Sequence, residues 1–249
     1  MKAIALCICA IVGYFLLLAS PDLPNWGDPN SPASTHVSPY YIKHSMEETD
    51  VPNFVTSVLA DYRGYDTMFE TTVIFCAGLT VLSVLRRSHR AREKIVRPRP
   101  ARRNADIILQ EASRLLLAPM QLFALYVIAH GHHSPGGGFQ GGVILGSSFI
   151  LLAIVYDLQY VLGRISEKTI LRFSGIGVSI YAGIGALCLL WGGNFLAYAS
   201  WSKVLPVSKE MAHSYGILGV EIGVAITVMA IMLSLYLDLA SNGEMDEGL

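Results

Sequence analysis

The sequence predicts an all-α polytopic membrane protein with six transmembrane helices. Its 249 residues are 53% hydrophobic with a mean hydropathy of +0.47, and the apolar residues lie in continuous blocks and not in alternation with polar ones. A helix needs about 20 mostly apolar residues to cross a hydrocarbon core about 30 Å thick. Six blocks reach or approach that length: Ala3–Ala19, Thr67–Leu85, Leu115–His130, Gly138–Leu162, Ile170–Gly192 and Tyr215–Leu239.

The first block has some features of a secretory signal peptide, since Lys2 precedes the apolar run and Ala19 and Ser20 close it. The small-x-small cleavage pattern is absent, however, because a leucine occupies the −3 place and Pro21 follows. We therefore expect a retained helix. The proline-rich stretch Pro21–Asp66 is expected to be an extramembrane loop, with a short surface helix over Pro52–Ala60.

A basic cluster between the second and third blocks sets the predicted topology. Glu93 is the one acidic residue in the cluster, whose members are Arg86, Arg87, Arg90, Arg92, Lys94, Arg97, Arg99, Arg102 and Arg103. Cytoplasmic loops carry an excess of Lys and Arg, and no aromatic residues are interleaved here as they would be in a nucleic-acid site. We expect the cluster and both termini in the cytoplasm, and the loop before the second helix outside.

Small residues recur at every fourth position in the later blocks, so each set lies on one helix face where backbones can approach closely. We expect these stripes to face the bundle: Gly138, Gly142, Gly146; Gly175, Ser179, Gly183; and Gly219, Gly223, Thr227. The cysteines Cys7, Cys9, Cys76 and Cys188 all lie inside apolar blocks. They are predicted to be packing residues and not disulfides or metal ligands.

Carboxylates within apolar blocks indicate function, because a charge at the bilayer centre costs roughly 3 kcal/mol on insertion scales. Glu221 is the deepest, about 12 Å along its helix from His213. It points away from Gly219, so it must face another helix or another subunit. Asp157 falls on the face of Gly146, which predicts a place inside the packed seam; a snorkelling or hydrogen-bonded carboxylate is the alternative.

Glu70 follows Asp66 by four residues, so both carboxylates lie on one helix face about 6 Å apart. At an effective dielectric of about 20 they repel each other by roughly 2.8 kcal/mol. One of them is then expected to exchange protons near neutral pH. An ion pair between Arg63 and Asp66 would remove this effect.

Three histidines, His130, His132 and His133, lie in a glycine-rich turn between the third and fourth blocks. The turn is short, so those two helices are predicted to be antiparallel neighbours. A metal site, proton exchange at the mouth of a pathway and a structural role all remain open for the imidazoles; titration close to physiological pH favours proton exchange over metal. The glycines indicate a close backbone crossing with Pro135 setting the turn, since no Gly-Lys-Ser/Thr follows them as in a phosphate loop.

This turn carries a family resemblance. His130-Gly131-His132, followed by Pro135-Gly136-Gly137-Gly138-Phe139-Gln140-Gly141-Gly142, resembles the signature of the MnhB family, one of the membrane subunits of the Mrp/Mnh-type multisubunit Na⁺/H⁺ antiporters. Arg114 and Pro119 also stand in their expected places, and the likeness covers about Asp106 to Leu239.

A second run, from Asn53 to Glu70, is similar to the short membrane element that precedes the MnhB part in these systems. That element occurs at the C-terminal end of the large MnhA-type subunit, or as a small subunit of membrane-bound hydrogenases. The chain departs from the family pattern at Phe69, where a small residue is common, and in the long proline-rich loop before Asn53.

The resemblance implies a fusion of two domains, residues 1–105 with two helices and residues 106–249 with four. It implies an accessory subunit without a cofactor or an active site for covalent chemistry of its own, in a complex that is either a stand-alone antiporter or a redox-driven translocating oxidoreductase. The implied partners are antiporter-module subunits of the A, C, D, E, F and G kinds, with a redox arm in the second case. The implied surroundings are the prokaryotic cytoplasmic membrane, Na⁺ and H⁺, and no nucleic acid.

We assign the ion or proton pathway to six residues: Asp66, Glu70, His130, His132, Asp157 and Glu221. The structural motif is assigned to Pro135, Gly136, Gly137, Gly138, Gly141 and Gly142. Two alternatives remain open: a stand-alone metal or cation transporter that uses the histidine turn, and a purely structural spacer subunit.

Overall fold

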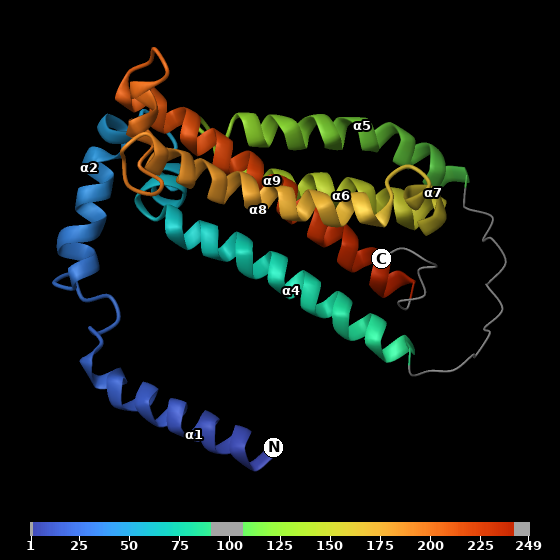
Figure 1. The fold of residues 1–249 in the computed structure, drawn as a ribbon, viewed down its shortest axis with the longest axis horizontal. Coiled ribbons are helices and arrows are strands. Elements are labelled where there is room, and N and C mark those ends of the chain that lie inside the picture. Colours follow the sequence, from blue (N-terminus) through green and yellow to red (C-terminus); the bar gives the residue numbers. More distant parts are fainter. Residues whose placement is uncertain (1, 91–106, 242–249) are drawn as a thin grey trace. The chain divides into compact units, whose positions relative to one another are not determined.

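The computed structural model describes residues 2–90 and 107–241, and every regular element within them is helical (Figure 1). Six helices are long and apolar enough to cross a membrane: Ala3–Asp22, Gly64–Leu85, Ile107–Ala129, Gly138–Tyr156, Glu167–Leu190 and Lys209–Ala240. The predicted all-α class with six spans is confirmed. Most of the basic cluster, from Arg92 to Arg103, lies outside the described residues.

The chain divides into two compact units, Met1–His44 and Ser45–Leu249. The first contains α1 (Lys2–Ala19), the short turns η1 (Ser20–Asp22) and η2 (Ala33–Val37), and the beginning of α2 (Ser38–Thr49). Helix α2 lies in the stretch that we expected to be a loop. Pro39 is its second residue, and the helix follows the π-helical turn η2 directly.

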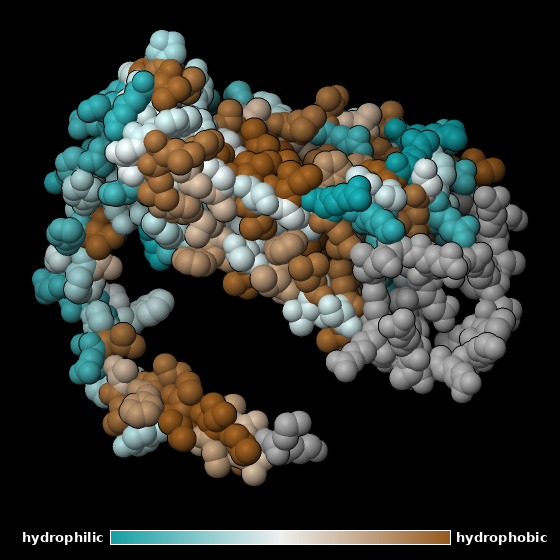
Figure 2. All heavy atoms as spheres, in the orientation of Figure 1, coloured by the Kyte–Doolittle hydropathy of each residue, from teal (hydrophilic) through white to brown (hydrophobic). Residues whose placement is uncertain are grey.

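The second unit is a helical bundle built around α9 (Lys209–Ala240). Helices α8 (Glu167–Leu190), α6 (Gly138–Tyr156) and α4 (Gly64–Arg90) pack against α9, and α5 (Ile107–Ala129) packs mainly against α6 (Figure 1). The antiparallel pairing of α5 with α6 is thus confirmed. Apolar residues cover the middle of the bundle and hydrophilic ones lie towards its ends (Figure 2), as expected for membrane helices.

Shorter elements complete the second unit. The segment before α4 forms α3 (Phe54–Ser57) and the π-helical turn η3 (Val58–Tyr62), where we predicted one short helix over Pro52–Ala60. A five-residue helix, α7 (Leu158–Leu162), follows α6, and the 3-10 helix η4 (Tyr198–Lys203) precedes α9.

Two of the three predicted glycine seams are confirmed. A Cβ at Gly138 would overlap the backbone of Glu221, and one at Gly142 would lie 2.7 Å from the carbonyl oxygen of Ala225, so this stripe holds α6 against α9. Gly223 of α9 is held in the same way against Gly177 of α8. Bulkier residues at these places would separate the helices.

The remaining seam is wrong for this bundle. A Cβ at Gly175 or Gly183 would meet nothing within 4 Å, whereas one at Gly177 would overlap α9. Residues two apart lie about 200° apart around a helix. Because Gly177 contacts α9, the stripe that contains Gly175 faces away from the bundle. The four cysteines are all free, and Cys188 is buried in the core.

Asp157 is not inside the packed seam, so that prediction is wrong. The residue has φ 91° and ends α6, and its side chain accepts a hydrogen bond of 2.7 Å from the Leu158 N–H that begins α7. The predicted single helix is broken here. Counting 100° per residue from Gly146 therefore misplaced the carboxylate, which is exposed.

Candidate functional site

The glycine-rich turn folds over a buried carboxylate of α9. Glu221 is 8% exposed, and a Cβ at Gly137 would lie 2.7 Å from its Oε1 while one at Gly131 would lie 3.1 Å from its Oε2. Gly137 also has φ +131°, which L side chains rarely adopt. The backbone N–H of Gly138 donates a hydrogen bond to the carboxylate. The motif glycines therefore bring bare backbone against Glu221.

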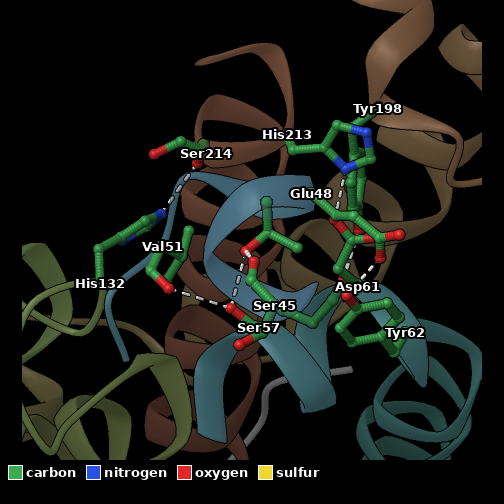
Figure 3. Close-up of polar contacts among 12 residues, drawn as sticks. Ser45, Glu48, Val51, Ser57, Asp61, Tyr62, His132, Tyr198, His213 and Ser214 are labelled. Carbon is green, nitrogen blue, oxygen red and sulfur yellow. Dashed lines mark hydrogen bonds and ion pairs between the residues drawn. The ribbon is translucent and has the colours of Figure 1, made fainter. Parts of the chain in front are cut away.

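His132 is the imidazole of the turn that faces this carboxylate. It is buried, with its Nδ1 3.8 Å from Glu221 Oε2. Its Nε2 lies 2.9 Å from the carbonyl oxygen of Ser214 (Figure 3). A carbonyl only accepts, so Nε2 carries the ring proton and Nδ1 presents a lone pair to Glu221. Burial lowers the pKa of His132, and the hydrogen bond to Ser214 opposes that shift. The ring is therefore neutral at neutral pH, and one proton is enough for the pair.

The other two histidines do not converge with His132. His130 is exposed and stacks on Tyr126 with ring centroids 4.5 Å apart, and His133 lies edge-on to it at 5.8 Å. Among the described residues, no group of three or more His, Cys, Asp or Glu side chains is arranged to hold a metal ion.

Asn53, at the start of α3, holds the turn in place. Its Nδ2 donates to the carbonyl oxygens of Gly131 and Ser134 at 2.8 Å each, and its backbone N–H donates to that of His132 at 2.8 Å. Thr56 Oγ1 donates to Gly131 as well, at 2.8 Å. The segment that resembles the small hydrogenase subunit thus binds the turn that resembles MnhB.

We expect Asn53→Asp to weaken this attachment more than Asn53→Ala does. Asp keeps the oxygen that caps α3 through the Val55 N–H, but it cannot donate and places a negative charge against two carbonyl oxygens. The melting temperature of the purified complex, or protection of the turn from protease, measures the effect. Equal stability of the Asp variant and wild type would show that the two donated bonds contribute nothing.

A second, partly buried pair, which sequence reasoning missed, links the segment after α3 to α9. Asp61 of η3 is paired with Nδ1 of His213, and Tyr62 donates its hydroxyl proton to Glu48 nearby (Figure 3). These side chains line an open cavity of about 380 Å³. His213 lies just before an apolar block, and that was its only signal in the sequence.

The other predicted pathway residues lie apart from Glu221. Arg63 forms an ion pair with Asp66, which was the alternative to a repelling pair of Asp66 and Glu70. The side chains of Arg63 and Asp66 are both more than half exposed. Glu70 is exposed on α4. Of the six assigned residues, the structure brings together only His132 and Glu221; the roles of all six stay predictions.

Comparison with known proteins confirms the family resemblance that the glycine-rich turn carries. The family described as "Domain related to MnhB subunit of Na+/H+ antiporter" matches residues 108–234, just over half of the chain. This chain belongs to the MnhB family. A second family, MbhE, described as a subunit of MBH, matches residues 28–103. The B subunit of the Na(+)/H(+) antiporter of Bacillus subtilis is 32% identical over 131 residues, which are 50% of this chain and 90% of that protein.

Two solved structures share the fold of this MnhB-family chain. A chain of the membrane-bound sulfane sulfur reductase, an archaeal respiratory membrane complex, aligns with TM-score 0.59 and 27% identity over 93% of this chain and 97% of its own length. A chain of the Mrp complex from Dietzia sp. DQ12-45-1b aligns with TM-score 0.65 and 24% identity over 98% of this chain and 27% of its own length. The protein is a multi-pass protein of the prokaryotic membrane.

Proposed function

We propose that this chain is an accessory membrane subunit of a multisubunit cation/proton antiporter module, in which Glu221 and His132 form its own proton-holding pair. One observation carries the proposal: the family's glycine motif presses backbone and one imidazole against a single buried carboxylate. A residue that served only to pack helices would be apolar, because a buried charge is costly without a partner. The proposed partners are other membrane subunits of the module.

The fused small-subunit segment supports an accessory role. In one relative a similar fold occupies almost a whole chain, and in the other it occupies 27% of a longer one. We propose that residues 1–105 and 106–249 are two ancestral pieces joined in one chain, which now meet where Asn53 binds the turn. The parent complex is an antiporter or a redox-driven relative of one.

The histidine-turn transporter has little to support it. A metal-selective mouth needs convergent imidazoles, whereas His132 points to Ser214 and Glu221 while His130 stacks on Tyr126. The spacer alternative predicts that charge-neutral replacements of Glu70, Asp157 and Glu221 leave transport unchanged, so the same variants test it.

Orientation is a further part of the proposal, with both termini in the cytoplasm. The basic residues between the second and third spans would otherwise have to be translocated. We expect a membrane-impermeant thiol reagent added outside to label Asn30→Cys and not Arg90→Cys, in a background without native cysteines. Labelling of Arg90→Cys by external reagent would reverse the topology.

Glu70 is proposed to face a neighbouring subunit and not lipid, because it is exposed within the span Gly64–Leu85 and a charge facing lipid is costly. We expect Glu70→Gln to lower cation-dependent proton flux without loss of the assembled complex, and Glu70→Asp to keep part of the flux. A pH-sensitive dye in vesicles measures this. Wild-type flux in an assembled Gln variant, across the working pH range, would make Glu70 a packing residue.

Membrane vesicles from cells that lack this chain test the proposed function itself. We expect Na⁺-dependent proton flux to fall to background and to return when the chain is supplied. Undiminished flux in its absence, with the other subunits still present, would contradict an essential accessory role.

A further inference from the structure

A small cavity of about 60 Å³ lies beside Glu221, between the segment that contains α3 and η3 and the helices α8 and α9. Its polar wall consists of Glu221, Gln140 and three hydroxyl-bearing side chains, Thr56, Thr67 and Tyr181. The remaining wall is apolar or glycine. No Lys, Arg or His belongs to the described residues that line it.

The three hydroxyl groups have no proton left to offer a ligand. Thr56 donates to the carbonyl oxygen of Gly131, Thr67 to that of Leu59 and Tyr181 to that of Gly64, each at 2.8 Å. A hydroxyl has one proton and two acceptor lone pairs. Each oxygen therefore acts towards the cavity as an acceptor, which suits a cation and disfavours an anion.

The carboxylate needs a positive charge. Glu221 Oε2 is buried and has no hydrogen-bond partner among the described residues. The titratable groups that face it are His132 of the turn, whose ring is neutral, and Tyr181 of α8. The hydrogen bond from the Gly138 N–H compensates the carboxylate only in part, and burial of an incompletely paired ion costs several kcal/mol of solvation. Either a proton or a small cation must therefore neutralise Glu221.

We propose that this cavity binds a small monovalent cation of the size of Na⁺, which takes the place of the proton on Glu221. Its volume of about 60 Å³ exceeds the roughly 10–15 Å³ of such space that one water molecule needs, so a dehydrated cation and water fit in it. Carboxylate, amide and hydroxyl oxygens are the ligands that hard cations prefer. The displaced proton leaves the carboxyl group for water, while the His132 ring, whose Nδ1 lies 3.8 Å from Oε2, stays neutral.

This inference deepens the proposed function, because it makes Glu221 the group at which H⁺ and the cation compete. The test is calorimetric titration of NaCl into the detergent-solubilised complex purified through this chain, with choline chloride as the control for ionic strength. We expect saturable Na⁺ binding that weakens as pH falls. Glu221→Gln should have one saturable site fewer.

A threonine pair provides the matched control. Thr67→Val removes one wall oxygen and should weaken binding about tenfold or more. Thr80→Val removes a hydroxyl of the same helix that bonds to the Cys76 carbonyl oxygen, away from the cavity, and should change nothing. This comparison decides the matter even if Glu221→Gln fails to assemble.

The inference is overturned if wild type and Glu221→Gln have the same number of saturable sites, or if Thr67→Val and Thr80→Val bind alike. Proton flux that depends on Glu221 without Na⁺ binding there would leave the proposed function standing and remove the cation site. Binding that depends on Glu221, in a chain whose loss leaves flux unchanged, would remove the proposed function and keep the site.

Discussion

Replacing Glu221 by Gln should lower cation-dependent proton flux through the assembled complex by about tenfold or more, equivalent to about 1.4 kcal/mol or more in the barrier. Gln preserves the shape of the side chain and its acceptance of the hydrogen bond from the Gly138 N–H, but its amide cannot take up and release a proton. Glu221→Asp should keep part of the flux, since the charge remains but lies one methylene further from His132. Dye-detected proton movement in vesicles, normalised to complex content, measures all three proteins.

The matched control for this experiment is Glu111→Gln. Glu111 is an exposed carboxylate that pairs with Arg114 on the surface of α5, so its replacement should leave flux near that of wild type. Flux through an assembled Glu221→Gln complex at the wild-type rate would make the buried carboxylate a structural residue. Equal losses in both variants would show that the assay reports general damage.

Gly138→Ala should prevent assembly of the complex, the second large effect. The added Cβ would overlap the backbone of Glu221, which cannot move aside as a flexible side chain would, and overpacking of this kind typically costs about 1–3 kcal/mol or more. Gly142→Leu should fail for the same reason against Ala225. The yield of partner subunits that co-purify with the tagged chain, compared with its expression level, measures assembly.

Gly146→Ala is the control within the same seam, because its Cβ would lie 3.4 Å from Met229, an ordinary contact distance. It should assemble as wild type does. If Gly138→Ala and Gly146→Ala assemble equally well, the close contact between α6 and α9 is not what holds the turn over Glu221.

Much of the fold could be predicted because membrane helices are long and apolar and are separated by polar or glycine- and proline-rich segments. The hairpin of α5 and α6 followed from the shortness of one glycine-rich turn, and the seam from Gly138 to Gly146 followed from spacing alone. The arithmetic failed where backbone geometry changed. Asp157 interrupts the helix with a positive φ, so its face could not be counted from Gly146. The contact of Gly177 was not predicted because it depends on the position of Gly223 on the neighbouring helix α9, and the pattern within one helix does not contain that position.

The site was harder to predict because its parts come from distant segments. That Glu221 faces another helix was predictable from the face of Gly219, but its contact with His132 depends on how the turn folds back. The pair of Asp61 and His213 joins residues 152 apart in sequence and carries no local pattern. Conversely, Glu70 and Asp66 are four residues apart on one helix as predicted, but Arg63 forms an ion pair with Asp66.

Reconstitution most directly tests the claim that this MnhB-family chain is one component of a cation/proton antiporter module. The complex purified through a tag on this chain and the chain purified alone are placed in separate liposomes, and proton movement is followed after a Na⁺ pulse. The account predicts Na⁺-dependent proton flux from the complex and none from the chain alone. Flux from the isolated chain at the rate of the complex would contradict it, and would make the chain a transporter in its own right.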